Sequence, residues 1–128
     1  MLGVLVLVGG CTAFLAMRVL TTAKSPADAT NDYLEAIRTG ETATAFGLLC
    51  QPRRSKLTRE RFARSVADER RANGAVIRHR VLATFVESDG KALARYTLTT
   101  SKRVGTVEAQ LQKEDGAWKL CDFREVPP

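Results

Sequence analysis

The side chains best suited to chemistry in this 128-residue chain are few: three cysteines, one histidine, two tyrosines and one tryptophan. His79, with Cys50 and Cys121, does not supply the set of ligands that a zinc site needs. The sequence also contains no Gly-rich phosphate-binding loop and no Gly-x-Ser-x-Gly nucleophile motif. We therefore expect neither a bound metal nor a cofactor, and the sequence by itself indicates no catalytic residue.

Cys50 and Cys121 are the two cysteines that follow the apolar N-terminus. Such a pair in a small extracytoplasmic domain favours a disulfide, and closing a loop of about 70 residues would stabilise the fold by about 4 kcal/mol. The alternative is two buried free thiols, because cysteine is often a small core residue. We expect the disulfide, and with it a domain outside the cytoplasm.

The N-terminus has the composition of a membrane segment. Met1 to Met17 contain no charged residue, and twenty helical residues span about 30 Å, the thickness of the hydrocarbon core of a bilayer. We expect a transmembrane helix over residues 1–20 and a juxtamembrane linker over residues 21–25. The alternative is a lipid anchor, because Val8-Gly9-Gly10-Cys11 resembles a lipobox, although the residues after Cys11 are still apolar.

The orientation of this segment is less clear from charge. Arg18 and Lys24 follow it, and the positive-inside tendency would then place the domain in the cytoplasm. The cysteine pair favours the opposite side, and we give it more weight. The predicted localisation is the cell membrane, with a single pass and an extracytoplasmic domain.

The excess positive charge is concentrated in one segment. Between Pro52 and Arg80 there are ten Lys or Arg residues and only three acidic ones, in a chain with a net charge of +6. This segment is a candidate surface for anionic headgroups or cell-wall phosphates, and the alternative is a solvated arginine-rich face. Aromatic residues are not interleaved with the basic ones, so no nucleic acid is expected. The candidate contact residues are Arg53, Arg54, Lys56, Arg61, Arg64 and Arg71.

Hydrophobic periodicity predicts three helices, over residues 25–40, 41–50 and 57–74, with residues 51–57 as a basic loop. From Ala75 the period changes to two, which predicts strands over residues 75–87, 91–100, 105–113 and 117–123. The expected fold class is α+β: an N-terminal transmembrane helix, then three helices packed on a curved, cone-like four-stranded antiparallel sheet. The domain is expected over residues 26–125, with a pocket at the open end of the cone.

The alternation also predicts which residues share a face. In the first strand these are Ile77, His79, Val81, Ala83 and Phe85. In the last strand Trp118 and Leu120 share a face with Asp122, whereas Cys121 has the opposite parity. Trp118 and Cys121 can therefore both face the helices only if a bulge intervenes.

Two stretches resemble a known superfamily. "YLEAIRTGETATAFGLLC", followed by Phe62 and Val66 on a third helix, and "KEDGAWKLCDF" near the end are similar to the nuclear transport factor 2-like (cystatin-like cone) superfamily. More narrowly, the chain resembles membrane-anchored bacterial members whose domain has no assigned function. The resemblance covers residues 26–125, and it implies a cone that often dimerises through the open face of its sheet.

Enzymes of this superfamily work through acidic residues, tyrosines or histidines inside the cone. The resemblance makes Tyr33, His79, Tyr96 and Trp118 pocket candidates, although the core role is the favoured explanation for His79 and Trp118. Asp122 shares a face with Trp118 and Leu120 but lies close to the C-terminus, and no other carboxylate has an inward strand position. A convincing base for proton transfer is therefore missing.

The expected function is a membrane-anchored, extracytoplasmic, non-catalytic domain that binds a partner protein, an envelope component or a small apolar ligand. The alternative is a pocket enzyme of the ketosteroid-isomerase-like or dehydratase-like kind. The resemblance also makes a homodimer possible.

Overall fold

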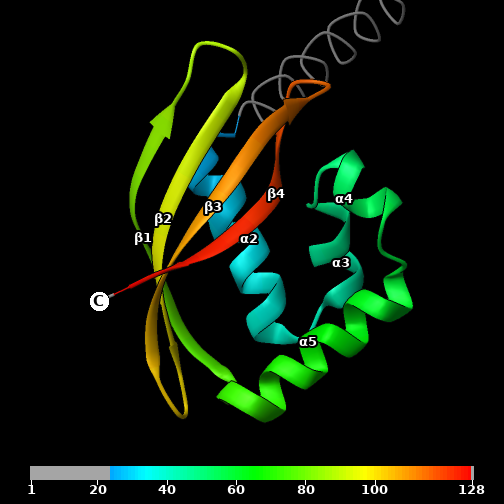
Figure 1. Ribbon diagram of the computed structural model, residues 1–128, viewed down its shortest axis with the longest axis vertical. Helices are drawn as coiled ribbons and strands as arrows, with labels where there is room; N and C mark the ends of the chain where they lie inside the picture. Colours follow the sequence, from blue (N-terminus) through cyan, green and yellow to red (C-terminus); the bar gives the residue numbers. More distant parts are fainter. Residues whose placement is uncertain (1–23, 128) are drawn as a thin grey trace, which may run out of the picture.

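The computed structural model describes residues 24–127, which form one helical layer and one sheet (Figure 1). The elements in chain order are α2 (Pro26–Thr39), α3 (Thr42–Gly47), α4 (Gln51–Ser55), α5 (Arg59–Asn73), β1 (Val76–Val86), β2 (Lys91–Thr100), β3 (Val104–Glu114) and β4 (Ala117–Val126).

Helix α2 begins and ends where its capping residues predict. The Ser25 side chain accepts a hydrogen bond from the backbone N–H of Asp28 at 3.1 Å, and Pro26 occupies the first turn, where its missing N–H is not needed. Gly40 ends the helix with a φ of 79°, a left-handed conformation that favours glycine. These local signals fix the length of the helix that crosses the sheet.

The sheet is an antiparallel meander with the strand order β1-β2-β3-β4. A two-residue turn, Asp115–Gly116, joins β3 to β4, and both of its residues have positive φ values (51° and 81°). This is the conformation for which Asp-Gly is favoured in tight hairpins. The Asp-Gly sequence therefore explains why the chain turns here.

The helices lie on one face of the sheet, and α2 is the helix that packs most closely on it (Figure 1). Small residues at the centre of the sheet, Ala92, Ala94 and Ala109, are at most 2% exposed. Helix α5 packs chiefly on α3, and it joins the sheet at its C-terminal end, where the Thr100 hydroxyl donates a hydrogen bond to the Asn73 carbonyl. The core lies between α2, α3 and the sheet.

The predicted architecture needs correction at two points. No helix within residues 24–127 is long and apolar enough to cross a bilayer, and the predicted transmembrane helix over residues 1–20 lies outside the described residues. Within residues 24–127 the helical layer has four helices, because residues 51–55 of the predicted basic loop form α4. Pro52 lies in the first turn of this helix, where proline starts a helix as readily as it ends one.

Strand β1 also departs from simple alternation. Register shifts place one extra residue at Ile77 and another at Leu82, so the strand changes face twice. His79 and Val81 face α2, as predicted, whereas Phe85 is on the opposite face and is 60% exposed. The prediction that all five alternate residues of this strand share one face was therefore wrong.

Candidate functional site

A cavity of about 500 Å³ lies between α2, α5 and the concave face of the sheet. Its apolar wall comes from both layers and consists of Ile37, Leu57, Phe62, Val66, Val76, Leu98, Val107 and Phe123. Tyr33 and Tyr96 also line it, and both are buried, with 9% and 4% of their surface exposed. The cavity therefore offers an apolar interior with two phenol groups in its wall.

The two phenols are held in their protonated form. Burial raises the pKa of Tyr33 to about 12, although the nearby charge of Arg53 acts to lower it. Burial likewise raises the pKa of Tyr96, and the neighbouring Tyr33 raises it further. Within residues 24–127 neither hydroxyl makes a hydrogen bond to another residue. Both hydroxyls are thus protonated donors that face the cavity without a protein acceptor.

A β-bulge in β4 gives the cavity its fourth aromatic ring. Gln110 pairs with Asp122 and the adjacent Leu111 pairs with Leu120, so Cys121 is the extra residue. Beyond the bulge the parity of the strand is reversed, and Phe123 points inward beside Tyr33. The bulge also resolves the parity conflict between Trp118 and Cys121, because Trp118 faces the core and Cys121 reaches Cys50.

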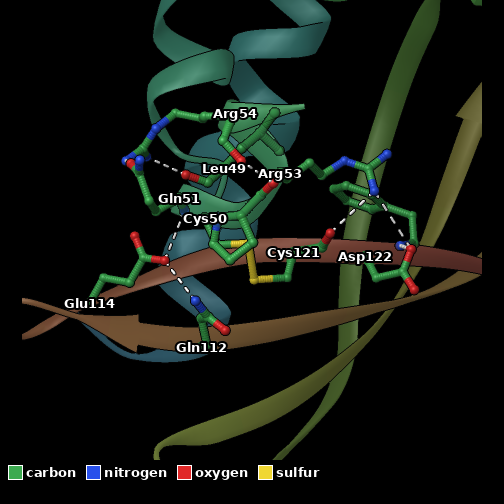
Figure 2. The surroundings of a disulfide bond; sticks show 12 residues. Leu49, Cys50, Gln51, Arg53, Arg54, Gln112, Glu114, Cys121 and Asp122 are labelled. Carbon is green, nitrogen blue, oxygen red and sulfur yellow. Dashed lines mark hydrogen bonds and ion pairs between the residues drawn. A yellow bond between two sulfur atoms is a disulfide. The ribbon is translucent and has the colours of Figure 1, made fainter. Parts of the chain in front are cut away.

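The disulfide between Cys50 and Cys121 joins the helical layer to this bulge, as Figure 2 shows. The Cα atoms are 5.1 Å apart, within the usual range, and the predicted disulfide is confirmed. Beside it the chain forms a short parallel bridge: the Cys50 N–H donates to the Leu120 carbonyl at 2.8 Å, and the Leu120 N–H donates to the Leu48 carbonyl at 2.9 Å. Covalent and backbone bonds therefore hold the same two segments together, residues 48–50 and residues 120–121, and we call this arrangement the clamp.

Charged side chains complete this clamp (Figure 2). Arg54 donates hydrogen bonds to the Leu49 carbonyl and, at 2.9 Å, to the side-chain oxygen of Gln51. The Glu114 carboxylate accepts the backbone N–H of Gln51 at 2.8 Å. Partial burial acts to raise the pKa of Glu114, but this bond, the Gln112 side chain and nearby cations outweigh it and lower the pKa. The carboxylate therefore stays charged at the start of α4.

Arg53 lies where the clamp meets the cavity. Its guanidinium donates a hydrogen bond to the Cys121 carbonyl at 3.2 Å and lies 3.6 Å from the Asp122 carboxylate (Figure 2). It also lies over the Phe123 ring, 5.4 Å from the ring centroid, and it lines the cavity. The bulge thus positions a cation at the cavity wall.

Other charged residues surround the mouth of the cavity. Arg103 pairs with Glu125, and Arg124 pairs with Glu108 at 2.9 Å. Glu125 is an inward position of β4 that the sequence analysis missed, because without the bulge its parity is outward. Its side chain is 64% exposed, so it belongs to the mouth rather than to the interior.

The structure separates the four pocket candidates. Tyr33 and Tyr96 lie together in the cavity wall. His79 lies between β1 and α2, outside this cavity, with Nε2 3.1 Å from a Glu35 carboxylate oxygen. Hydrogen bonds from Arg38 and His79 hold the pKa of Glu35 at about 2. Trp118 is buried in the core, with the Lys113 ammonium 5.7 Å from its ring centroid.

The six basic candidates are likewise divided. Arg53 and Arg54 hold the clamp, and Arg71 pairs with Asp68. Lys56, Arg61 and Arg64 are exposed and have no acidic partner within residues 24–127. Arg61 and Arg64 share a surface hollow along α5 with Asp68 and Glu69, so this surface carries both signs of charge. The anionic-surface assignment stays a prediction.

In the part of the chain that the structure describes, no group of three or more His, Cys, Asp or Glu residues has the arrangement to hold a metal ion.

Comparison with known proteins defines the fold alone. No protein-family model matches the chain, and no curated protein matches it. Among solved structures, it is similar to a SEC-C motif containing protein from Rhodopseudomonas palustris, with a TM-score of 0.65, 12% identity and 80% of each chain covered. It is also similar to a protein from Campylobacter jejuni described as an NTF2-like (nuclear transport factor 2-like) transpeptidase, with a TM-score of 0.61 and 14% identity over 77% of this chain and 99% of the other. The fold is therefore NTF2-like, as the sequence resemblance implied.

Proposed function

We propose that this NTF2-like domain is a non-catalytic binding domain that takes a small apolar ligand into its cavity. The observation that carries the proposal is the cavity itself, which has a mainly apolar wall and two buried phenols. Its volume of about 500 Å³ lies within the range of small-molecule sites, roughly 300–1,000 Å³. Ten of the lining residues are apolar or aromatic, and nine are polar or charged. Ligand sites generally combine a hydrophobic lining with polar groups that fix the orientation of the ligand.

Binding is favoured over catalysis by the positions of the carboxylates. A general base must lie within hydrogen-bond reach of the proton that it removes. The two carboxylates that line the cavity, Glu69 and Glu125, are both exposed, and Glu125 is paired with Arg103. The phenols cannot replace them as bases near neutral pH, because burial raises the pKa of both. A ketosteroid-isomerase-like activity would need a base in the interior.

We further propose that the domain works in an extracytoplasmic compartment. Support comes from the disulfide between Cys50 and Cys121, because disulfides persist in oxidising compartments and are rare in the reducing cytoplasm. The bond joins residues 71 positions apart and anchors Arg53 at the cavity wall through the Cys121 carbonyl. A reduced protein would lose this constraint on its own binding site.

The neutral apolar dye N-phenyl-1-naphthylamine tests the binding function, because its fluorescence rises when it enters an apolar site. We expect saturable binding to the full chain. Val107→Phe, which places a larger side chain in the cavity, should weaken binding at least tenfold. Gln110→Phe is the matched control, since it adds the same ring to the opposite, exposed face of the same strand. Equal binding by both variants, or no saturable binding by the wild type, would contradict the proposal.

A further inference from the structure

The cavity contains two hydrogen-bond donors that the protein leaves without an acceptor. Tyr33 and Tyr96 are each more than nine-tenths buried and line the cavity, and neither hydroxyl has a hydrogen-bond partner within the described residues. Neither hydroxyl oxygen is among the described buried polar atoms that lack a partner, so both are accessible from the cavity. An acceptor group that enters the cavity can therefore bond to them.

The two phenols act on the same region of the cavity. They are close enough for the ionised form of Tyr33 to raise the pKa of Tyr96. A carboxylate has two oxygens that only accept hydrogen bonds, so one such group can satisfy two phenol donors. Hydrogen bonds to a charged acceptor are also stronger than those to a neutral one.

A fixed positive charge lies beside these donors. Arg53 lines the cavity, and its charge reaches the Tyr33 hydroxyl, where it favours the negative form. Its acidic partner, Asp122, is 3.6 Å away and is 67% exposed, so solvent weakens the neutralisation. Arg53 is therefore available to balance an anion bound inside.

The remaining charges of the wall also favour an anion over a cation. Four arginines and two glutamates line the cavity, and two of the arginines, Arg103 and Arg124, are paired with Glu125 and Glu108. Glu125 is already paired with Arg103, and Glu69 accepts a hydrogen bond from the Asn73 side chain. Arg70 has no acidic partner among residues 24–127. The apolar side chains of the wall suit a hydrocarbon or aromatic body.

We propose that the ligand is an apolar carboxylate whose oxygens accept hydrogen bonds from the Tyr33 and Tyr96 hydroxyls, with Arg53 balancing its charge. This inference rests on the proposed binding function and names the chemical class of its ligand. The apolar body of the molecule packs against Ile37, Val66, Leu98 and Val107. The carboxylate lies toward α4, where the bulge at Cys121 holds Arg53.

Three probes with the same ten-carbon chain test the inference: decanoate, decanol and decylamine, each titrated into the full chain at pH 7 by calorimetry. We expect decanoate to bind about tenfold more tightly than decanol, and decylamine to bind most weakly, because the charge-assisted hydrogen bonds are available to the carboxylate alone. Arg53→Gln should reduce the preference for decanoate over decanol, because it removes the charge that balances the carboxylate. Arg59→Gln removes the same charge from an exposed position outside the cavity, and it should leave the preference intact.

Tyr96→Phe removes one donor with little change of shape, and it should lower the affinity for decanoate about tenfold. Circular dichroism of each variant verifies that it is folded, and the comparison of probes on the wild type does not depend on any variant. Equal binding of decanol and decanoate would overturn the carboxylate assignment and leave the binding function standing. Binding of N-phenyl-1-naphthylamine without any binding of decanoate would also overturn the assignment alone. Failure of the dye and of all three probes would overturn both proposals.

Discussion

Tyr33 on α2 stacks on Phe123 on β4, with the ring centroids 5.3 Å apart and the ring planes at 26°. This contact connects the helix that crosses the sheet to the strand that carries the disulfide. It exists because the bulge at Cys121 turns Phe123 toward the helices. The same ring lies under the guanidinium of Arg53, so one aromatic side chain supports both a phenol and a cation of the proposed site.

Phe123→Ala should lower the free energy of unfolding by about 2 kcal/mol, because it removes a partly buried ring and its stacking contact. Urea unfolding measures the change. Phe123→Leu keeps most of the apolar volume and should lose less. A Phe123→Ala variant as stable as the wild type would show that the stacking contact does not form in solution.

Because of the disulfide, the effects of substitutions at its two cysteines on the free energy of unfolding should not be additive. Cys50→Ser and Cys121→Ser should each destabilise the fold by about 2–5 kcal/mol, because either change opens a loop of 71 residues. The double variant should be no less stable than the weaker single variant, since both changes remove the same bond. Denaturant unfolding measures all three. Non-reducing mass spectrometry of protein from its native compartment should show the wild type two hydrogens lighter than its reduced form.

The two tyrosines predict a shifted alkaline titration. They are the only tyrosines of the chain, so the rise of tyrosinate absorbance near 295 nm reports Tyr33 and Tyr96 alone. In the folded protein this rise should begin clearly above pH 10, whereas in 6 M guanidinium chloride its midpoint should lie near 10. A folded protein whose phenols both ionise near pH 10 would contradict their burial.

The sign of the linked stability change follows from the raised pKa values. Below pH 10 both states keep the phenol protons, so the tyrosines do not make stability depend on pH. Above pH 10 the unfolded chain releases protons first, and the free energy of unfolding should fall as the pH rises toward 12, the pKa of folded Tyr33. Tyr96→Phe should make this fall less steep. Urea unfolding midpoints measured between pH 9 and pH 12 test this fall in stability.

Arg54 and Arg59 differ in what they contact, although both belong to the basic segment. Arg54→Gln should destabilise by about 1 kcal/mol, because it removes the hydrogen bond to the partly buried Leu49 carbonyl. Arg59→Gln should change the free energy of unfolding by less than about 0.5 kcal/mol, because Arg59 is exposed in the first turn of α5 and has no partner within residues 24–127. Thermal unfolding of both variants tests the difference. Equal destabilisation would show that charge, rather than the clamp, decides the effect.

Local sequence determined the helices and strands of this protein to a large extent. Ser25 and Gly40 define the ends of α2, and Asp115–Gly116 defines the hairpin between β3 and β4, because capping and tight-turn conformations depend on only a few adjacent residues. The one element that was missed, α4, begins at a Cys-Gln-Pro sequence whose proline is compatible with both the end and the start of a helix. The pairing of Cys50 with Cys121 followed from there being two such cysteines in the domain.

Tertiary structure alone decided which side chains enter the cavity. Simple alternation places Asp122 on the face of Trp118 and Leu120, but the bulge at Cys121 leaves Asp122 exposed and turns Phe123 inward. A bulge of this kind is specified by the partner strand and by the bond to Cys50, which are distant in the chain, so no local pattern announces it. His79 and Tyr96 both have inward parity on their strands, yet α2 lies against the first and leaves the second open to the cavity. Parity determines which face of a sheet a residue occupies, whereas the packing of a helix on that face determines whether the residue lines a site.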